Sequence, residues 1–211
     1  VRVLCVERAI AYGCSLYELQ VFGTGGSAKP PVDYGENLAL NKTVTCSGTR
    51  DEWWMKDEEG NIKPDAYNNV KPENAVDGNT STAFTSYQGD DQWLTVDLGQ
   101  AYTLGRIVIN WNADAGKIYD VLVSSDNNNW TTVHRVTRGF AYKTDNFTLY
   151  RQNVRYVKVL GYTKVESGSG IGIAELSVYK YNEGDSKENE TVGDLPTRQI
   201  INNANGKGSY V

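Results

Sequence analysis

The sequence predicts an all-β protein built as an antiparallel sandwich or jelly roll. Between Asn37 and Lys180, short runs alternate apolar and polar residues, which is the pattern of half-buried strands. Turn-forming clusters such as DLGQ, SSDNNN and SGSG separate these runs, and no stretch shows the apolar spacing of an amphipathic helix. Folds of this class hold their functional loops on a rigid sheet, so we expect function to lie in loops.

Composition limits the possible classes of function. The 211 residues are 39% hydrophobic and carry a formal net charge of −5, so the chain can bury a core but has no basic patch for nucleic acid. No apolar run approaches the roughly 20 residues of a membrane helix. The three cysteines (Cys5, Cys14 and Cys46) and the single His134 predict neither a disulfide framework nor a zinc site. We expect Cys46 to be a free thiol.

The first 23 residues resemble a later part of the chain. The stretch VRVLCVERAIAYGCSLYELQVFG (residues 1–23) resembles VKVLGYTKVESGSGIGIAELSVYK (residues 157–180), at an offset of about 156 residues. A repeat of this length is a domain rather than a solenoid unit. We therefore expect residues 1–23 to be the last two strands of an upstream copy, so that the chain is a segment of a longer protein.

The complete copy is expected to span residues 37–181, between two linkers. Residues 24–36 are rich in Gly, Ser and Pro, and residues 182–194 are acidic and lack periodicity. Residues 195–211 are expected to begin a further module or to form a tail.

Within this copy, strict alternation predicts which strand faces are buried. In QWLTVDLG, Leu94, Val96 and Leu98 share one face, and in RIVINW, Ile109 and Trp111 do the same. We expect Trp111 to lie in the core. The stretches YDVLVSSD, RYVKVLGY and AELSVYKY continue the pattern.

Six motifs follow one another in an order that resembles the discoidin domain, also called the coagulation factor V/VIII C-type domain: NLALNKTVTCSG, NAVDGNTST, QWLTVDLGQAYTLGRIVINW, YDVLVSSDNNNW, RYVKVLGY and IAELSVY. The bacterial members of that family are the family 32 carbohydrate-binding modules. The resemblance covers about residues 37–181. It implies an eight-stranded jelly-roll β-sandwich that binds ligand through loops at one end, usually attached to a secreted glycoside hydrolase.

The bend DGNTST (residues 77–82) has two interpretations. By itself it is an ordinary polar hairpin turn. The resemblance instead implies a structural Ca²⁺ site, and Ca²⁺ takes six to eight oxygen ligands. The implied ligands are the Asn74 carbonyl, the Asp77 side chain, the Asn79 carbonyl, Thr82, the Ala174 carbonyl and the Glu175 side chain. Ala83 and Phe84 stand where family members often have Arg-Trp, so a sugar contact from that Arg is absent.

The long polar loop of residues 48–73 carries the aromatic side chains that suit a sugar ligand. Trp53 and Trp54 are adjacent and cannot both face the core from one strand, so we expect at least one to stack on ligand. The alternative is that both cover the edge of the sandwich. The predicted ligand-binding residues are Trp53, Trp54, Tyr67, Asn112, Asp114, Lys117, Tyr162, Lys164 and Glu166.

Three residues qualify this prediction. Asn112 stands where the family commonly has an acidic residue, which weakens the case for a cationic amino sugar. Arg138 and Tyr142 in the stretch TRGFAYKTD are expected to form a solvated face rather than a site.

The favoured function is a non-catalytic carbohydrate-binding module that tethers a secreted, multimodular, bacterial glycoside hydrolase to polysaccharide or glycan. The alternative is a calcium-containing discoidin domain that binds a lipid surface or a protein partner through its tryptophan loop. The acidic flanks RDE and KDEE disfavour anionic lipid. We expect no catalysis, because no nucleophile stands beside a base.

Overall fold

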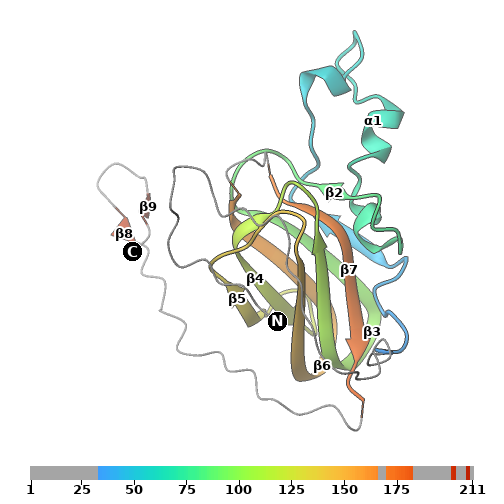
Figure 1. Ribbon diagram of the computed structural model, residues 1–211, viewed down its shortest axis with the longest axis vertical. Helices are drawn as coiled ribbons and strands as arrows, with labels where there is room; N and C mark the ends of the chain where they lie inside the picture. The colour runs from blue at the N-terminus through green and yellow to red at the C-terminus, as the bar shows by residue number, and fades with distance from the viewer. Residues whose placement is uncertain (1–32, 166–169, 183–200, 203–207, 210–211) are drawn as a thin grey trace, which may run out of the picture. The chain divides into compact units, whose positions relative to one another are not determined.

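The structure is a computed structural model that describes residues 33–165 and 170–182, and the backbone of residues 201–202 and 208–209. From Tyr34 onward the described residues are predominantly β-structure (Figure 1), which confirms the predicted all-β class. The strands of the main sheet are β1 (Thr43–Cys46), β2 (Phe84–Thr85), β3 (Gln92–Trp111), β4 (Gly116–Ser124), β5 (Thr131–Val136), β6 (Thr144–Lys164) and β7 (Gly172–Lys180).

Two long strands fold this sheet into two layers. In one layer, the first half of β3 pairs with β1 on one side and with the second half of β6 on the other. The second half of β6 also pairs with β4, and β4 pairs in turn with β5. The second half of β3 pairs with β7 and with the first half of β6, and β2 extends this layer beyond β7. Register shifts between Asp97 and Arg106 mark the bend. Because β3 and β6 serve both layers, the described residues form a seven-stranded antiparallel sheet instead of the expected eight separate strands.

One core lies between the layers. Leu94, Val96 and Leu98 are fully buried, and so is Ile109, as the alternation predicted. Trp111 is 3% exposed, which confirms that it belongs to the core. Each such side chain contributes roughly 1.5–3 kcal/mol through removal of apolar surface from water. The strand ends, and hence the loops, are therefore held on a rigid frame.

A long excursion, residues 47–83, joins β1 to β2 and projects from one end of the sandwich (Figure 1). It contains the 3₁₀ helix η1 (Trp53–Met55), the α-helix α1 (Pro64–Asn68) and the 3₁₀ helix η2 (Pro72–Val76). Both α1 and η2 begin at a proline, whose missing N–H would have no helical partner at that position. Met55 is fully buried and anchors η1.

Tyr34, which was expected to belong to the first linker (residues 24–36), packs against the domain. The Tyr34 ring lies 5.4 Å from the Tyr179 ring, between centroids, and the Arg106 guanidinium carbon is 4.1 Å from the Tyr34 centroid. The Asn37 side-chain oxygen accepts the Val178 N–H at 3.0 Å. Strand β7 therefore fixes the start of the domain.

Several sequence-based predictions fall outside the described residues: the upstream copy (1–23), most of the first linker, nearly all of the second linker, Cys5 and Cys14. Cys46 is a half-buried free thiol, as predicted. Within residues 195–211, β8 (Ile201–Asn202) and β9 (Gly208–Ser209) pair as an antiparallel two-stranded sheet. In the part of the chain that the structure describes, no helix combines the length and apolarity needed to span a bilayer.

Candidate functional site

Several loops meet at the end of the sandwich from which the excursion projects. Backbone hydrogen bonds tie them together: the Tyr87 N–H donates to the Gly48 carbonyl at 3.0 Å, and the Val165 N–H donates to the Ala115 carbonyl at 2.9 Å. This loop end, defined by residues 47–73, 86–91, 112–115, 137–143 and the described part of 165–171, is where the family resemblance predicted a ligand site.

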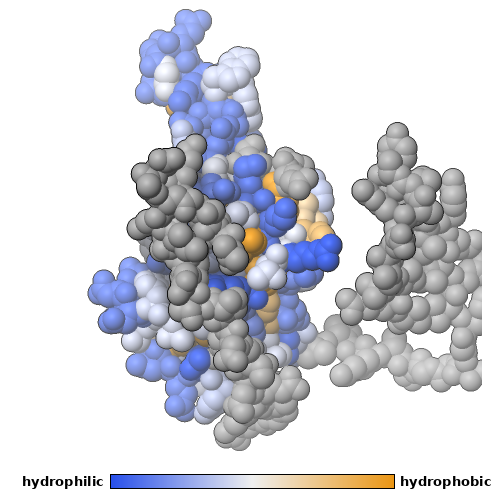
Figure 2. Space-filling view, turned by 90° about the vertical axis from the view of Figure 1, so that its left-hand side faces the viewer, coloured by the Kyte–Doolittle hydropathy of each residue, from blue (hydrophilic) through white to orange (hydrophobic). Residues whose placement is uncertain are grey.

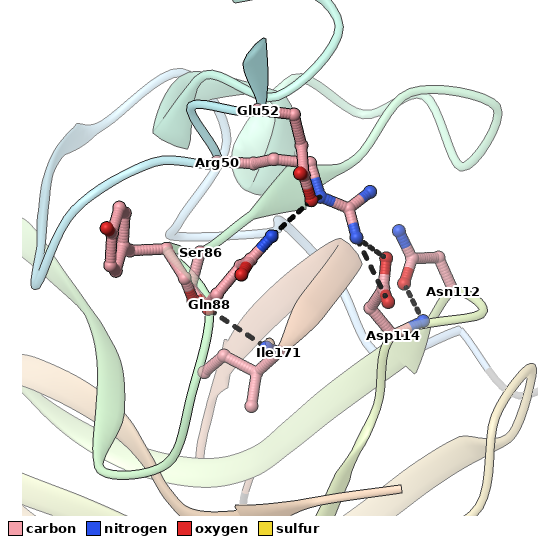
Figure 3. A network of polar contacts seen from close by, with 8 residues as sticks. Arg50, Glu52, Ser86, Gln88, Asn112, Asp114 and Ile171 are labelled. Carbon is pink, nitrogen blue, oxygen red and sulfur yellow. Dashed lines mark hydrogen bonds and ion pairs between the residues drawn. The ribbon is translucent and has the colours of Figure 1, made fainter. Parts of the chain in front are cut away.

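An arginine–carboxylate network lies at the base of the loop end (Figure 3). Arg50 Nη2 is 3.4 and 3.3 Å from the two Asp114 carboxylate oxygens, and Arg50 Nε is 3.8 Å from Glu52 Oε1. The Gln88 amide donates to the same Glu52 oxygen. Arg50 Nε is buried and has no hydrogen-bond partner among the described residues. The Arg50 side chain is 20% exposed, so the outer part of the network remains accessible to a polar ligand.

The β3–β4 turn holds Asp114 in place. The Asp114 N–H donates to Asn112 Oδ1 at 2.7 Å, and the Asn112 N–H donates to the Gly172 carbonyl at 3.0 Å. A Cβ on Gly172 would lie 2.1 Å from Asn112 Oδ1, so a larger residue there would displace the turn. Asn112, a predicted ligand residue, therefore also braces the turn, and Asp114, another, is buried within the network.

The start of β7 fixes the 86–91 loop in the same way (Figure 3). Ser86 Oγ accepts the Ile171 N–H at 2.9 Å, and the Ser86 N–H donates to the Ile171 carbonyl at 2.9 Å. A Cβ on Gly170 would lie 2.4 Å from Ser86 Oγ. This close approach places Gln88 within reach of the network.

The predicted aromatic residues of the excursion face solvent. Trp53 is 83% exposed, Trp54 54% and Tyr67 40%. The two tryptophans lie in the 3₁₀ helix η1 rather than in a strand, so the 83% exposed Trp53 covers little of the sandwich edge. On the face drawn in Figure 2, hydrophilic residues cover most of the projecting excursion. Exposed aromatic rings in a polar surrounding suit stacking on the C–H faces of a sugar.

The other predicted ligand residues are not brought together in one place. Lys117 is exposed near the start of β4. The Tyr162 hydroxyl donates to the buried Asp120 at 2.8 Å, which ties this ring to the sheet. Lys164 ends β6, and its backbone N–H donates to Asp90 at 3.3 Å. Glu166 lies outside the described residues.

The Asp77–Thr82 bend gathers oxygen atoms. The Thr82 hydroxyl lies 2.7 Å from Asp77 Oδ2 and 2.7 Å from the Asn79 carbonyl oxygen. Because one hydroxyl carries one proton, it can donate to only one of these two oxygens. Gly78, with φ of +78°, makes the bend without strain. Such crowding of oxygens is what a bound cation relieves.

Strand β7 brings a buried carboxylate to this bend. Glu175 is 4% exposed, and its Oε2 accepts the Gly78 N–H at 3.0 Å. Burial, with a further contribution from the charge of Asp77, raises the pKa of Glu175 to about 7, although the Gly78 N–H opposes the shift. A buried carboxylate near a second carboxylate is costly without a cation.

This donor set fits Ca²⁺, which prefers oxygen ligands. The described residues contain no group of three or more His, Cys, Asp and Glu side chains arranged to hold a metal. An ion here would therefore rely on carbonyl and hydroxyl oxygens besides Asp77 and Glu175. Asn74 and Ala174, both predicted to supply carbonyls, are buried.

Sequence reasoning did not identify Arg50, Glu52 or Gln88 as site residues. Arg50 and Asp114 are 64 residues apart, and no spacing pattern links them. The available signal is the stretch RDE immediately before Trp53, which by itself indicates only that the tryptophans have charged neighbours.

Comparison with known proteins agrees with this fold. Residues 74–159 match the family model of the F5/8 type C domain, described as a NedA-like, galactose-binding domain. Chitosan-binding module 1, from a chitosanase/glucanase of Paenibacillus sp. IK-5, is 32% identical with a TM-score of 0.56, over 69% of this chain and 99% of the module. Module 2 of the same enzyme, solved with chitotriose, is 28% identical with a TM-score of 0.55, over 68% and 99%.

A curated relative is the polysaccharide lyase 8 family protein HylA of Enterococcus faecalis (strain ATCC 700802 / V583). It is 33% identical over 104 residues, which are 49% of this chain but only 7% of HylA. The chain belongs to the F5/8 type C, galactose-binding-like family of β-sandwich domains, whose structural neighbours here are carbohydrate-binding modules.

Proposed function

We propose that the chain is a non-catalytic carbohydrate-binding module that binds a polysaccharide or oligosaccharide glycan at the loop end. The observation that carries this proposal is the Arg50–Glu52–Asp114 network, in which the Arg50 side chain is 20% exposed, with the exposed Trp53 and Trp54 following Glu52 directly in the chain. Sugar sites combine an aromatic platform with a few oriented polar groups, and both elements are present.

The bound sugar need not be the one bound by the relatives. The two solved relatives are chitosan-binding modules, and chitosan carries amino groups. Here the residue after Trp111 is the amide Asn112, and the nearby carboxylates of Glu52 and Asp114 both face Arg50. The single Arg50 guanidinium offsets one of these two carboxylates, and the family's further acidic residue is replaced by an amide, so we propose glycan binding without assigning an amino sugar.

The proposed role is to tether a secreted, multimodular carbohydrate-active enzyme to its substrate. Tethering raises the effective substrate concentration at a linked catalytic domain. The relatives support it: two modules derive from a chitosanase/glucanase, and HylA is named as a polysaccharide lyase. The repeat in residues 1–23 supports a neighbouring copy of the same module. Because the chain spans 7% of HylA, the activity of a parent enzyme is not assigned.

We also propose a structural Ca²⁺ held by Asp77, Glu175 and the oxygens of Asn74, Asn79, Thr82 and Ala174. When bound, the ion supplies positive charge to a buried carboxylate and its neighbour. The chain itself contributes the bend at Gly78 and the position of Glu175 on β7, which join the excursion to the sheet. Lipid binding through Trp53 and Trp54 is less well supported, because the excursion is hydrophilic (Figure 2) and its sequence is acidic.

A glycan array with the full chain in Ca²⁺ tests the proposal. Wild type is expected to bind a defined set of glycans, and Trp53→Ala/Trp54→Ala is expected to lose at least about tenfold in affinity. The matched control is Trp130→Ala, which removes the same side chain at the opposite end of β4 and β5. Binding that survives the double substitution but not the control would contradict the site. Binding to phosphatidylserine vesicles without any glycan hit would favour the lipid alternative.

A further inference from the structure

The two layers of the sandwich meet along an open side that lies between β5 and the first half of β6. Strand β5 ends one layer and pairs with β4, and the first half of β6 pairs with β3. A side-chain hydrogen bond crosses this open side, because His134 Nε2 on β5 is 3.2 Å from the Thr148 carbonyl oxygen on β6. A carbonyl can only accept, so Nε2 carries the proton and Nδ1 of the neutral ring does not.

A bulge in β5 lets His134 reach the second layer. The register between β4 and β5 skips Val133, which is therefore an extra residue on β5. Val133 is 1% exposed in the core, and the His134 ring stacks on the Phe147 ring of β6, with centroids 4.5 Å apart. Phe147 packs in turn against the core. The imidazole therefore joins the two layers by a ring contact as well as by a hydrogen bond.

The carboxylates on the strands around His134 already hold other partners. Asp120 of β4 binds the Arg135 guanidinium, and β5 itself has no acidic residue. Asp145 of β6 binds the Lys143 ammonium. The cationic residues of the three strands are Lys117, Arg135, Arg151, Arg155, Lys158 and Lys164. Their tyrosines stay neutral below about pH 8. A protonated His134 would therefore have no counter-ion on these strands.

Acid should weaken the open side for this reason. Burial lowers the pKa of His134, a shift that the hydrogen bond to the Thr148 carbonyl opposes, and no carboxylate among the described residues contributes to it. The folded state thus binds fewer protons than the unfolded state as the pH falls below the ordinary value of 6.5. The stabilisation from the neutral ring is complete above that pH and is lost as the pH falls through the folded value. A charged imidazole is hydrated only when it leaves the open side.

We infer that His134 is an acid-sensitive latch between the two layers, whose neutral ring holds the edge of β5 against β6 and whose protonated ring releases it. Strand β5 leads directly into residues 137–143 of the loop end, so release of this edge also loosens one of the loops gathered there. The inference concerns the fold and does not rest on the proposed glycan-binding function.

NMR of the full chain tests both halves of the inference. His134 is the one histidine of the chain, so its ring signals report its protonation without further assignment, between about pH 8 and pH 5. Hydrogen exchange, corrected for the intrinsic effect of pH, gives the protection of the β5 amides. The ring should titrate with a midpoint below 6.5, and β5 should lose protection severalfold as the pH falls from 6.5 to that midpoint. The amides of β1, which pairs with β3 at the other edge of the same layer, should keep theirs.

Two variants separate the latch from a general effect of acid. His134→Gln keeps a side-chain N–H for the Thr148 carbonyl but cannot be protonated, so its β5 protection should not change over this range. Thr131→Gln places the same side chain at an exposed position of β5 and should respond to acid as wild type does.

Three results would overturn the inference: a ring midpoint at or above 6.5, unchanged β5 protection while the ring titrates, or an equal loss of protection in wild type and His134→Gln. If His134→Gln does not fold, the wild-type chain decides alone. A loss of β5 protection that begins only below the ring midpoint would then overturn the inference, because the latch requires the loss to occur above it.

Discussion

Asp120 is a buried carboxylate that binds the side chain of Tyr162, one of the predicted ligand residues. It is 1% exposed and accepts two hydrogen bonds from the Arg135 guanidinium, both at 2.6 Å, and one from the Tyr162 hydroxyl at 2.8 Å. Hydrogen bonding to Asp120 raises the pKa of Arg135. Loop chemistry in the sequence predicts Tyr162 as a ligand residue, because the sequence does not show that a carboxylate on the neighbouring strand β4 already binds its hydroxyl.

Removal of Arg135 should be costly for this reason. Arg135→Met leaves Asp120 buried without its cation, and we expect the free energy of unfolding to fall by about 3 kcal/mol or more in urea denaturation. The matched control is Arg155→Met, which breaks the similar Arg155–Asp97 pair at 2.8 Å, where the side chains are 41% and 27% exposed. Solvent screens that pair, so its loss should matter much less. Equal effects of the two substitutions would contradict the role given to Asp120.

At the scale of elements, the alternation of apolar and polar residues predicts which strand faces are buried, but it does not predict how the loops fold. Leu94 and Trp111 were assigned to the core because side chains of a strand point alternately to opposite faces. Adjacency also predicted that Trp53 and Trp54 would not both be buried in a strand, but it did not predict the 3₁₀ helix in which they lie. Arg50 reaches Asp114 through the fold of the excursion, which follows no period that a sequence can reveal.

The bend at Gly78 and strand β7 form the element that should respond to calcium. If Ca²⁺ binds there, adding it to chelator-treated protein should raise the unfolding midpoint. The free energy of unfolding should rise by about 2.7 kcal/mol at a Ca²⁺ concentration of 100 Kd. Glu175→Gln should abolish this response, and in chelator it should be at least as stable as wild type because no charge is buried.

The control for that experiment is Glu58→Gln, which neutralises an exposed acid of the excursion and should keep the calcium response. Thermal unfolding followed by circular dichroism, with and without chelator, measures all three proteins. A wild-type midpoint that does not change with Ca²⁺ would contradict the proposed cation site.

At the scale of the whole molecule, the order of motifs was more informative than any one motif. It predicted the sandwich and the end at which the loops gather. It also predicted that DGNTST and the Ala174–Glu175 pair would meet, and the structure places Glu175 3.0 Å from the Gly78 N–H.

The five tryptophans of the chain report on different regions of the molecule. Trp53 and Trp54 are at the loop end, whereas Trp111 is in the core, where its indole N–H donates to Asp145 at 2.9 Å. Trp130 lies at the opposite end of β4 and β5, with the Lys158 ammonium 3.9 Å from its ring centroid. Each indole N–H gives its own signal in an NMR spectrum of ¹⁵N-labelled protein, so one titration can locate the bound glycan.

The most direct test of the account is that titration, with a glycan found on the array and signals assigned by single Trp→Phe variants. The account predicts that the Trp53 signal, the Trp54 signal or both shift with glycan concentration, while those of Trp111 and Trp130 stay in place. Shifts of Trp130 with Trp53 and Trp54 unchanged would show that the glycan binds away from the loop end, and would contradict the central claim.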